Sequence, residues 1–144
     1  PVLRSRLMES WLAPTPDPEA VPMLERLASS GRRLAVLSNG SVPMLTGAFS
    51  ASGLVRLFDA VISVDMVRAF KPHPDVYRLA CERFDVEPHA IGFVSANGWD
   101  VAGSAAFGFE TIWLDRQGAT PEHLPVGPRA RVSRLSEIPA LLGA

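Results

Sequence analysis

Polar side chains close the apolar segment "IGFVSANGWD" at residues 91–100. Its first four residues suit a buried strand, and Ser95, Asn97 and Asp100 follow directly, with Trp99 among them. A carboxylate at Asp100 can hold or deprotonate a water molecule, although the same side chain also suits the start of a following helix. Trp99 is either a core aromatic or part of the wall of a small apolar substrate pocket. The segment therefore indicates a candidate site for chemistry that uses water.

A second polar group follows the apolar segment at residues 33–40, "RLAVLSNG". Ser38 and Asn39 are common turn residues, so they can simply connect a strand to a helix. Their hydroxyl, amide and neighbouring backbone N–H groups also form a set of donors that suits a carboxylate. Both interpretations stay open at this point.

Lys71 is the only lysine in a chain with thirteen arginines. A solvated surface charge is the ordinary interpretation. However, Pro72 and Pro74 stiffen the backbone beside it, and a compact ammonium fits between two carboxylates where a planar guanidinium does not. We therefore predict a functional role for Lys71. Tyr77, the only tyrosine, either packs in a helix or directs its hydroxyl towards the same site.

The rest of the pattern predicts elements that bring these groups together. Apolar runs at 33–40, 58–65, 90–96 and 110–115 predict strands, and they alternate with predicted helices. The helices include one with Leu45 and Phe49 on one face and Gly53 as its end, and others at 73–84 and 100–108. A weak edge strand and a last helix capped by Ser136 complete the chain. This alternation predicts a doubly wound α/β fold with a parallel sheet, whose strands deliver their polar exits to one rim.

The amino-terminal segment has a different pattern. Leu3, Leu7 and Trp11 lie four apart and predict one stripe of a helix, which "PTPDP" at 14–18 then breaks. We expect two parts, residues 1–15 and residues 16–144, with the site in the second.

Composition narrows the function classes. A net charge of −1 gives no reason to expect a nucleic-acid or membrane partner, and no apolar run approaches the length of a membrane span. Cys81 is the only cysteine, which favours a cytoplasmic location and core packing. The three histidines, His73, His89 and His123, have no metal-site spacing and are expected in surface loops.

Three segments resemble the haloacid dehalogenase superfamily, and within it the type II (L-)2-haloacid dehalogenases: "VLSNGS" at 36–41, "KPHPDVY" at 71–77 and "FVSANGWDVAGSAAFGFETIWLDR" at 93–116. The resemblance covers about residues 20–116. It implies a Rossmann-like core, and residues 1–15 look like the last helix of the family's helical cap. It also implies that a small 2-halo carboxylic acid is converted to a 2-hydroxy acid through an aspartyl ester, with release of halide.

The resemblance also implies roles for the matched residues. Ser38 and Asn39 would hold the substrate carboxylate, and Asn39 and Trp99 would help to bind the departing halide. Lys71 would keep the nucleophilic carboxylate ionised, supported by Tyr77 and Ser95. The remaining two side chains, those of Asn97 and Asp100, would place and activate the hydrolytic water.

Two features set limits on this expectation. Residues 95–99 contain no acid before Asp100, so we expect neither a metal nor another cofactor; a Mg²⁺-dependent phosphatase of the same superfamily is the alternative. The family's nucleophile belongs to an Asp-x-x-Gly-Thr type segment on a first strand, which residues 1–144 do not contain. We therefore expect the sequence to lack that strand, to be inactive alone and to self-associate, for instance as a homodimer. A non-catalytic module that binds small carboxylates is a third hypothesis.

Overall fold

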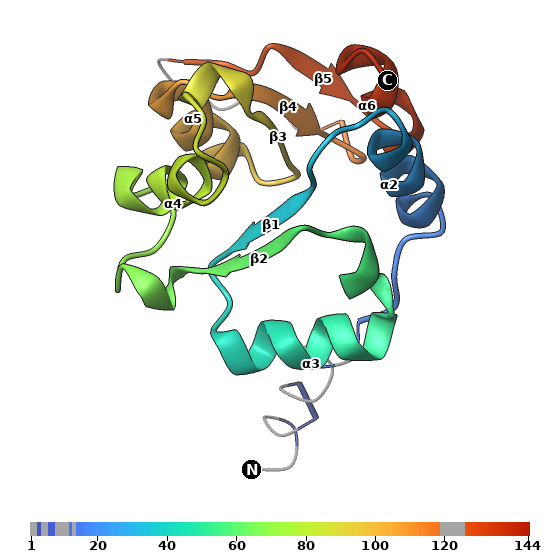
Figure 1. Ribbon diagram of the computed structural model, residues 1–144, viewed down its shortest axis with the longest axis vertical. Helices are drawn as coiled ribbons and strands as arrows, with labels where there is room; N and C mark the ends of the chain where they lie inside the picture. Colours follow the sequence, from blue (N-terminus) through green and yellow to red (C-terminus); the bar gives the residue numbers. More distant parts are fainter. Residues whose placement is uncertain (1–2, 4–5, 8–11, 13, 119–125) are drawn as a thin grey trace.

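The computed structural model describes residues 3, 6–7, 12, 14–118 and 126–144 (Figure 1). Its strands are β1 (Ala35–Ser38), β2 (Ala60–Ser63), β3 (Gly92–Ser95), β4 (Glu110–Leu114) and β5 (Ala130–Val132). The α-helices are α2 (Ala20–Ser29), α3 (Val42–Ser52), α4 (Pro74–Phe84), α5 (Gly98–Phe107) and α6 (Ile138–Leu141). Short 3₁₀ turns are η1 (Leu54–Leu57), η2 (Val64–Met66), η3 (Pro88–Ala90) and η4 (Leu135–Glu137). No helix in the described part of the chain is long and apolar enough to cross a membrane.

The strands are all parallel, as the sequence predicts, but they form two separate sheets. β1 pairs with β2 from Ala35↔Ala60 to Ser38↔Ser63. β4 lies between β3 and β5 in the second sheet. Within the described residues, β1 and β3 each have one strand neighbour. Although both are apolar in sequence, most of their residues stay partly exposed, which is unusual for strands of a parallel sheet.

Helices cover the two sheets and close the core. In Figure 1, α4 and α5 lie on one side of the molecule, α2 and α6 on the other, and α3 lies beside β2 at the end where the amino terminus emerges. One core cluster contains Ile62 of β2, Tyr77 of α4 and Phe109, so it spans both sheets. A second cluster joins β4 and β5 to α6. Helix packing and shared side chains therefore hold the two sheets together.

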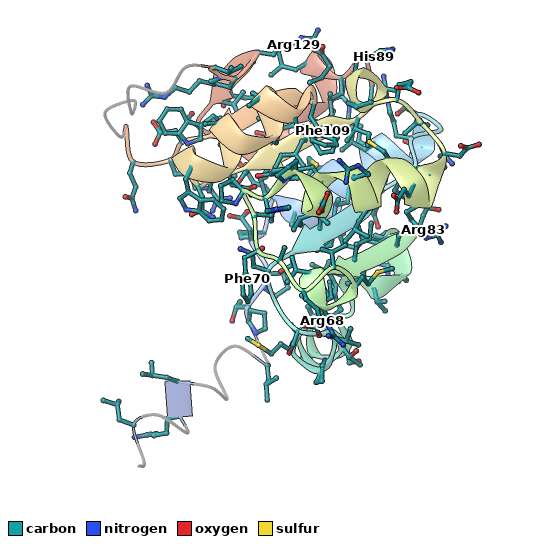
Figure 2. All side chains as sticks on the ribbon, turned by 90° about the vertical axis from the view of Figure 1, so that its left-hand side faces the viewer. Arg68, Phe70, Arg83, His89, Phe109 and Arg129 are labelled. Atoms are coloured by element: carbon teal, nitrogen blue, oxygen red, sulfur yellow. The ribbon has the colours of Figure 1, made fainter. Side chains whose placement is uncertain are left out.

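Several charged side chains and the two described histidines lie on the outside. Figure 2 shows Phe109 in the interior, whereas Arg83, His89 and Arg129 point outwards at the periphery. His73 and His89 are exposed, as expected, and His123 lies outside the described residues. The half-buried Cys81 packs against the first core cluster, and burial raises the pKa of its thiol. Its expected core role is confirmed.

Helix ends differ from expectation in one place. Gly53 ends α3 in the left-handed conformation, with φ 67°, as predicted. Ser136, however, caps no helix. The Glu137 carboxylate accepts the backbone N–H groups of Ser133 (3.0 Å) and Arg134 (2.9 Å), so the chain first forms the η4 turn and α6 starts at Ile138. The prediction of Ser136 as a cap was wrong. Ser136 lies inside the η4 turn, which the Glu137 carboxylate holds in place, and α6 begins two residues beyond Ser136.

The amino-terminal segment is described at four positions before residue 14, and all four are helical. Leu3 and Leu7 are 72% and 56% exposed, while Trp11 of the predicted stripe lies outside the described residues. Residues 14–17 form no regular structure, as "PTPDP" predicts. The division into residues 1–15 and 16–144 stays a prediction.

Candidate active site

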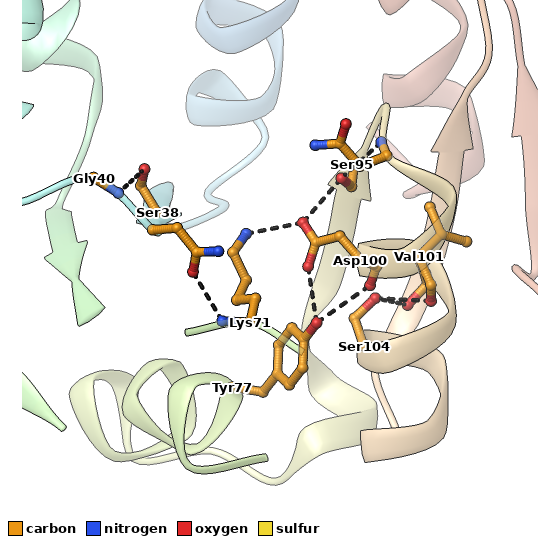
Figure 3. A network of polar contacts seen from close by, with 11 residues as sticks. Ser38, Gly40, Lys71, Tyr77, Ser95, Asp100, Val101 and Ser104 are labelled. Atoms are coloured by element: carbon orange, nitrogen blue, oxygen red, sulfur yellow. Dashed lines mark hydrogen bonds and ion pairs between the residues drawn. The ribbon is translucent and has the colours of Figure 1, made fainter. Parts of the chain in front are cut away.

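Asp100, in the first turn of α5, is the centre of a buried hydrogen-bond network (Figure 3). It is 2% exposed. Its Oδ2 accepts hydrogen bonds from Lys71 Nζ (2.9 Å) and Ser95 Oγ (2.9 Å), and its Oδ1 accepts one from Tyr77 Oη (2.8 Å). Three side-chain donors, one of them the Lys71 ammonium, thus converge on a carboxylate that is shielded from solvent. Lys71, Tyr77 and Ser95, all predicted for the site, therefore meet at the carboxylate of a fourth predicted residue, Asp100.

Lys71 is buried as an ion pair rather than solvated at the surface. Its side chain is 8% exposed and that of Asp100 is 3% exposed. Its backbone N–H donates to Asn39 Oδ1 at 2.8 Å, which ties the segment before α4 to the exit of β1. Its Nζ lies 5.2 Å from the ring centroid of Phe93 on β3, within cation–π range. Lys71 thus reaches from the exit of β1 to the exit of β3.

Tyr77 combines a packed ring with a directed hydroxyl, so both interpretations made from the sequence hold. The residue is fully buried. Its ring lies edge-on to Phe93 and Phe109, with centroids 6.0 and 5.7 Å away, and tilted against Phe107 at 5.7 Å. Burial, and then the hydrogen bond and charge of Asp100, raise the pKa of the phenol far above its ordinary value. Tyr77 is therefore held as a neutral donor to Asp100.

Ser38 and Asn39 follow β1 at the same rim. Ser38 Oγ accepts the backbone N–H of Gly40 at 3.0 Å, which is a turn interaction. This contact leaves the Ser38 hydroxyl proton available as a donor. Asn39 uses its oxygen for Lys71, and its NH₂ group has no partner among the described residues. Each residue therefore supports the local structure and still carries a donor for a ligand.

Asn97 joins the Asp100 network through its backbone, whose N–H donates to Ser95 Oγ at 3.2 Å. Asn97 is exposed and precedes α5 without a side-chain cap, and its carbonyl accepts the backbone N–H of Asp100 (3.0 Å). Trp99 is 41% exposed. It lines a shallow apolar hollow whose other walls come from the segment before α4 and from α5: Pro72, Pro74, Ala102, Gly103, Ala106 and Phe107. Neither Ser38 nor Asn39 lines this hollow.

Sequence reasoning missed two contributors to this site. Phe93 lies against Lys71 and Tyr77, and a strand residue in an apolar run gives no sign of such a contact. Gly103 faces Tyr77 and Pro72 from α5; its place in the small-residue run "AGSAA" is the one signal available. Among the residues that the structure describes, no three histidine, cysteine or carboxylate side chains cluster as a metal-ligand set.

Comparison with known proteins identifies the family. Residues 2–108 match the family of haloacid dehalogenase-like hydrolases. The chain belongs to this family. The resemblance found in the sequence is thereby confirmed, as is the α/β fold.

Relatives of this haloacid dehalogenase-like chain are longer than it is. (S)-2-haloacid dehalogenase 1 of Pseudomonas sp. strain CBS-3 is 41% identical over 140 residues, which is 97% of this chain and 62% of that protein. A dehalogenase crystal structure superposes with a TM-score of 0.94 at 40% identity, over 99% of this chain and 63% of the other. The L-2-haloacid dehalogenase of Xanthobacter autotrophicus with chloropropionic acid covalently bound superposes at 0.89 with 34% identity, over 94% and 64% of the two chains. The chain thus spans less than two thirds of each.

Proposed function

We propose that this chain is the larger part of a hydrolase that converts small (S)-2-halo carboxylic acids to 2-hydroxy acids. The observation that carries the proposal is the buried Lys71–Asp100 pair, 2.9 Å apart, at the rim where β1 and β3 end. The donors of Ser38, Asn39 and Ser95 surround the same rim. The names of the similar dehalogenases support the choice of substrate class.

The proposed reaction has two steps. An aspartate carboxylate attacks C2 of the substrate, a C–O bond forms, and the halide leaves with the C–halogen electron pair. Water then adds to the aspartate's carboxyl carbon in the resulting ester. The bond between that carbon and the oxygen attached to C2 of the substrate breaks. The products are the 2-hydroxy acid of inverted configuration, the regenerated carboxylate and a proton. The covalently bound chloropropionic acid in the Xanthobacter relative supports such an intermediate.

In this proposal, Lys71 holds the attacking carboxylate ionised from one side while Asp100 holds Lys71 from the other. The ionised Asp100 has about four lone-pair positions, and three donors occupy three of them. The fourth position can accept a proton from the hydrolytic water, which Asn97 would help to place. Ser38 Oγ–H and the Asn39 NH₂ group would bind the substrate carboxylate. Asn39 and Trp99 would help to bind the departing halide, with Trp99 contributing from the apolar hollow that it lines.

We further propose that the attacking aspartate belongs to the part of the relatives' length that this chain does not span. Asp100 itself is an unsuitable nucleophile, since its oxygens already accept three hydrogen bonds. β1 and β3 each have an open edge within the described residues and half-exposed apolar side chains. A further parallel strand between them would pair with both edges. An aspartate at its carboxyl end would then lie next to Lys71.

The test is a completed enzyme. The part of the Pseudomonas relative that precedes its aligned region is joined to residues 1–144, and halide release from (S)-2-chloropropionate is measured. We expect release with inversion from the completed enzyme, and none from its Lys71→Ala variant. A folded chimera that hydrolyses a phosphate ester only with Mg²⁺ would support the phosphatase instead. Binding of 2-chloropropionate without halide release would support a carboxylate-binding module.

A further inference from the structure

At Gly103, α5 packs closely against the segment that carries Lys71 and Tyr77. A Cβ atom at position 103 would lie 2.6 Å from Tyr77 Oη and 2.6 Å from Pro72 Cβ. Both distances are below 3.0 Å, which the contacts of real Cβ atoms essentially never reach. Gly103 is also one helical turn from Asp100, so the two residues lie on the same face of α5. A side chain at position 103 would therefore lie close to Asp100, the residue that accepts the hydrogen bonds of the network.

Neither neighbour of Gly103 can easily yield. The Tyr77 ring is fully buried among three phenylalanine rings, so its hydroxyl cannot swing aside as a flexible side chain would. The Pro72 ring is fixed to the backbone directly after Lys71. An added methyl group would have to push α5 away from the whole 71–77 segment. That movement would lengthen the contacts of Lys71 and Tyr77 with Asp100 together.

We propose that Gly103 is a positioning residue: the lack of a side chain there sets the spacing at which both Lys71 and Tyr77 reach Asp100. Glycine is otherwise a poor choice inside a helix, because alanine stabilises a helix interior relative to glycine. The helix alone predicts that Gly103→Ala stabilises the chain, whereas the positioning role predicts the opposite. An effect of Gly103 on catalysis rests on the proposed function, whereas its effect on the distances from Lys71 and Tyr77 to Asp100 does not.

The test uses two reporters that the chain already contains. Lys71 is its only lysine and Tyr77 its only tyrosine, so isotope-labelled lysine and tyrosine each give one assigned NMR signal. We expect Gly103→Ala to shift both signals towards those of the free amino acids and to lower the folding equilibrium constant about tenfold or more. Gly47→Ala is the matched control. It is also inside a helix, and its nearest contact is the flexible end of Leu12 at 3.1 Å; neither signal should move.

A second variant separates positioning from general damage. In a Tyr77→Phe background the hydroxyl that a Cβ would strike is absent, so Gly103→Ala should lower the folding constant by a clearly smaller factor than in the parent. Trimethylamine N-oxide is added throughout to keep weak variants folded. Unmoved signals in folded Gly103→Ala, or an equal loss in both backgrounds, would overturn the proposal. None of these measurements needs turnover, so an inactive completed enzyme would count against the proposed function alone.

Discussion

Lys71 Nζ and Asp100 Oδ2 lie 2.9 Å apart, and both side chains are almost completely shielded from solvent. A pair of this kind depends on both partners, because the partner left behind becomes an uncompensated buried charge. Removing one member of such a pair costs about 3–5 kcal/mol. The pair is therefore the point at which the site is most sensitive to substitution.

We expect Lys71→Arg to be nearly as damaging as Lys71→Ala in the completed enzyme. Arginine keeps the charge, but its larger planar group does not fit the space between Asp100, Phe93 and the attacking carboxylate. The measurement is the halide-release rate of each variant, with Arg56→Lys, an exposed ion-pair residue, as the control. If Lys71→Arg kept most of the parent rate, Lys71 would be a general electrostatic contributor and not a geometrically fitted one.

The stability of the chain should fall at alkaline pH through Tyr77. Its pKa is raised above the ordinary value of about 10, first by burial and then by Asp100. The folded state therefore keeps the proton to higher pH than the unfolded state does. This contribution is fully present below about pH 10 and is lost above it, at up to about 1.4 kcal/mol per pH unit. Urea unfolding of the parent and of Tyr77→Phe, compared across this range, isolates the tyrosine.

The near-ultraviolet absorbance of tyrosinate provides an independent check on this prediction. Because Tyr77 is the only tyrosine, the folded chain should show no tyrosinate at a pH where the urea-unfolded chain is already ionised. Equal ionisation of the folded and unfolded chains would contradict the buried, donating phenol.

Dehalogenation by the completed enzyme should persist in excess chelator. Residues 95–99 provide no acid, and Asp100 already accepts hydrogen bonds from three side chains. The substrate is also a carboxylate monoanion, unlike the more highly charged phosphoryl group that Mg²⁺ neutralises. Halide release is compared with and without chelator. Activity that disappears on chelation and returns with Mg²⁺ would be incompatible with this reading.

Residues 1–144 alone should release no halide and should self-associate. Among the described residues, β1 and β3 each have one open edge, whose backbone N–H and C=O groups a strand from another copy could pair. Each unpaired buried group costs about 1–3 kcal/mol. Light scattering measures the mass in solution, and a halide assay measures turnover. A well-folded monomer would refute the self-association, and steady halide release would refute the inactivity.

The sequence predicted the α/β fold with parallel strands, and it placed the polar groups of the candidate site at the strand ends. Lys71 stood out because it is the only lysine, and the polar strand exits at Ser38 and Ser95 meet at one rim because parallel strands all end on the same side. These signals are local. The order of the strands is not a local signal: the gap between β1 and β3 was expected only from the family resemblance, which implies a first strand that residues 1–144 do not contain. Alternation of apolar and polar residues carries no information on that order.

Side-chain contacts across elements were equally hard to predict. Trp99, in the first turn of α5, lines a hollow together with Pro72 and Pro74, and its expected role in binding the halide stays a prediction. Phe93 was counted as a plain strand residue because its contact with Lys71 joins segments 22 residues apart. Such contacts depend on how the helices pack, and a single sequence does not contain that geometry explicitly.

The division into two sheets has a consequence for cooperativity. No strand-to-strand hydrogen bond joins β1–β2 to β3–β5 within the described residues, so the halves are linked by helix packing, by the shared core around Tyr77 and by the contacts of Lys71. Amide exchange should therefore report two units with different opening free energies. Ser38 and Asn39 belong to one unit, whereas Ser95 and Asp100 belong to the other. Each opening between the two units would thus separate the groups proposed to bind the acid from those proposed to hydrolyse its ester, and the proposed catalysis would require the two units to stay closed on each other.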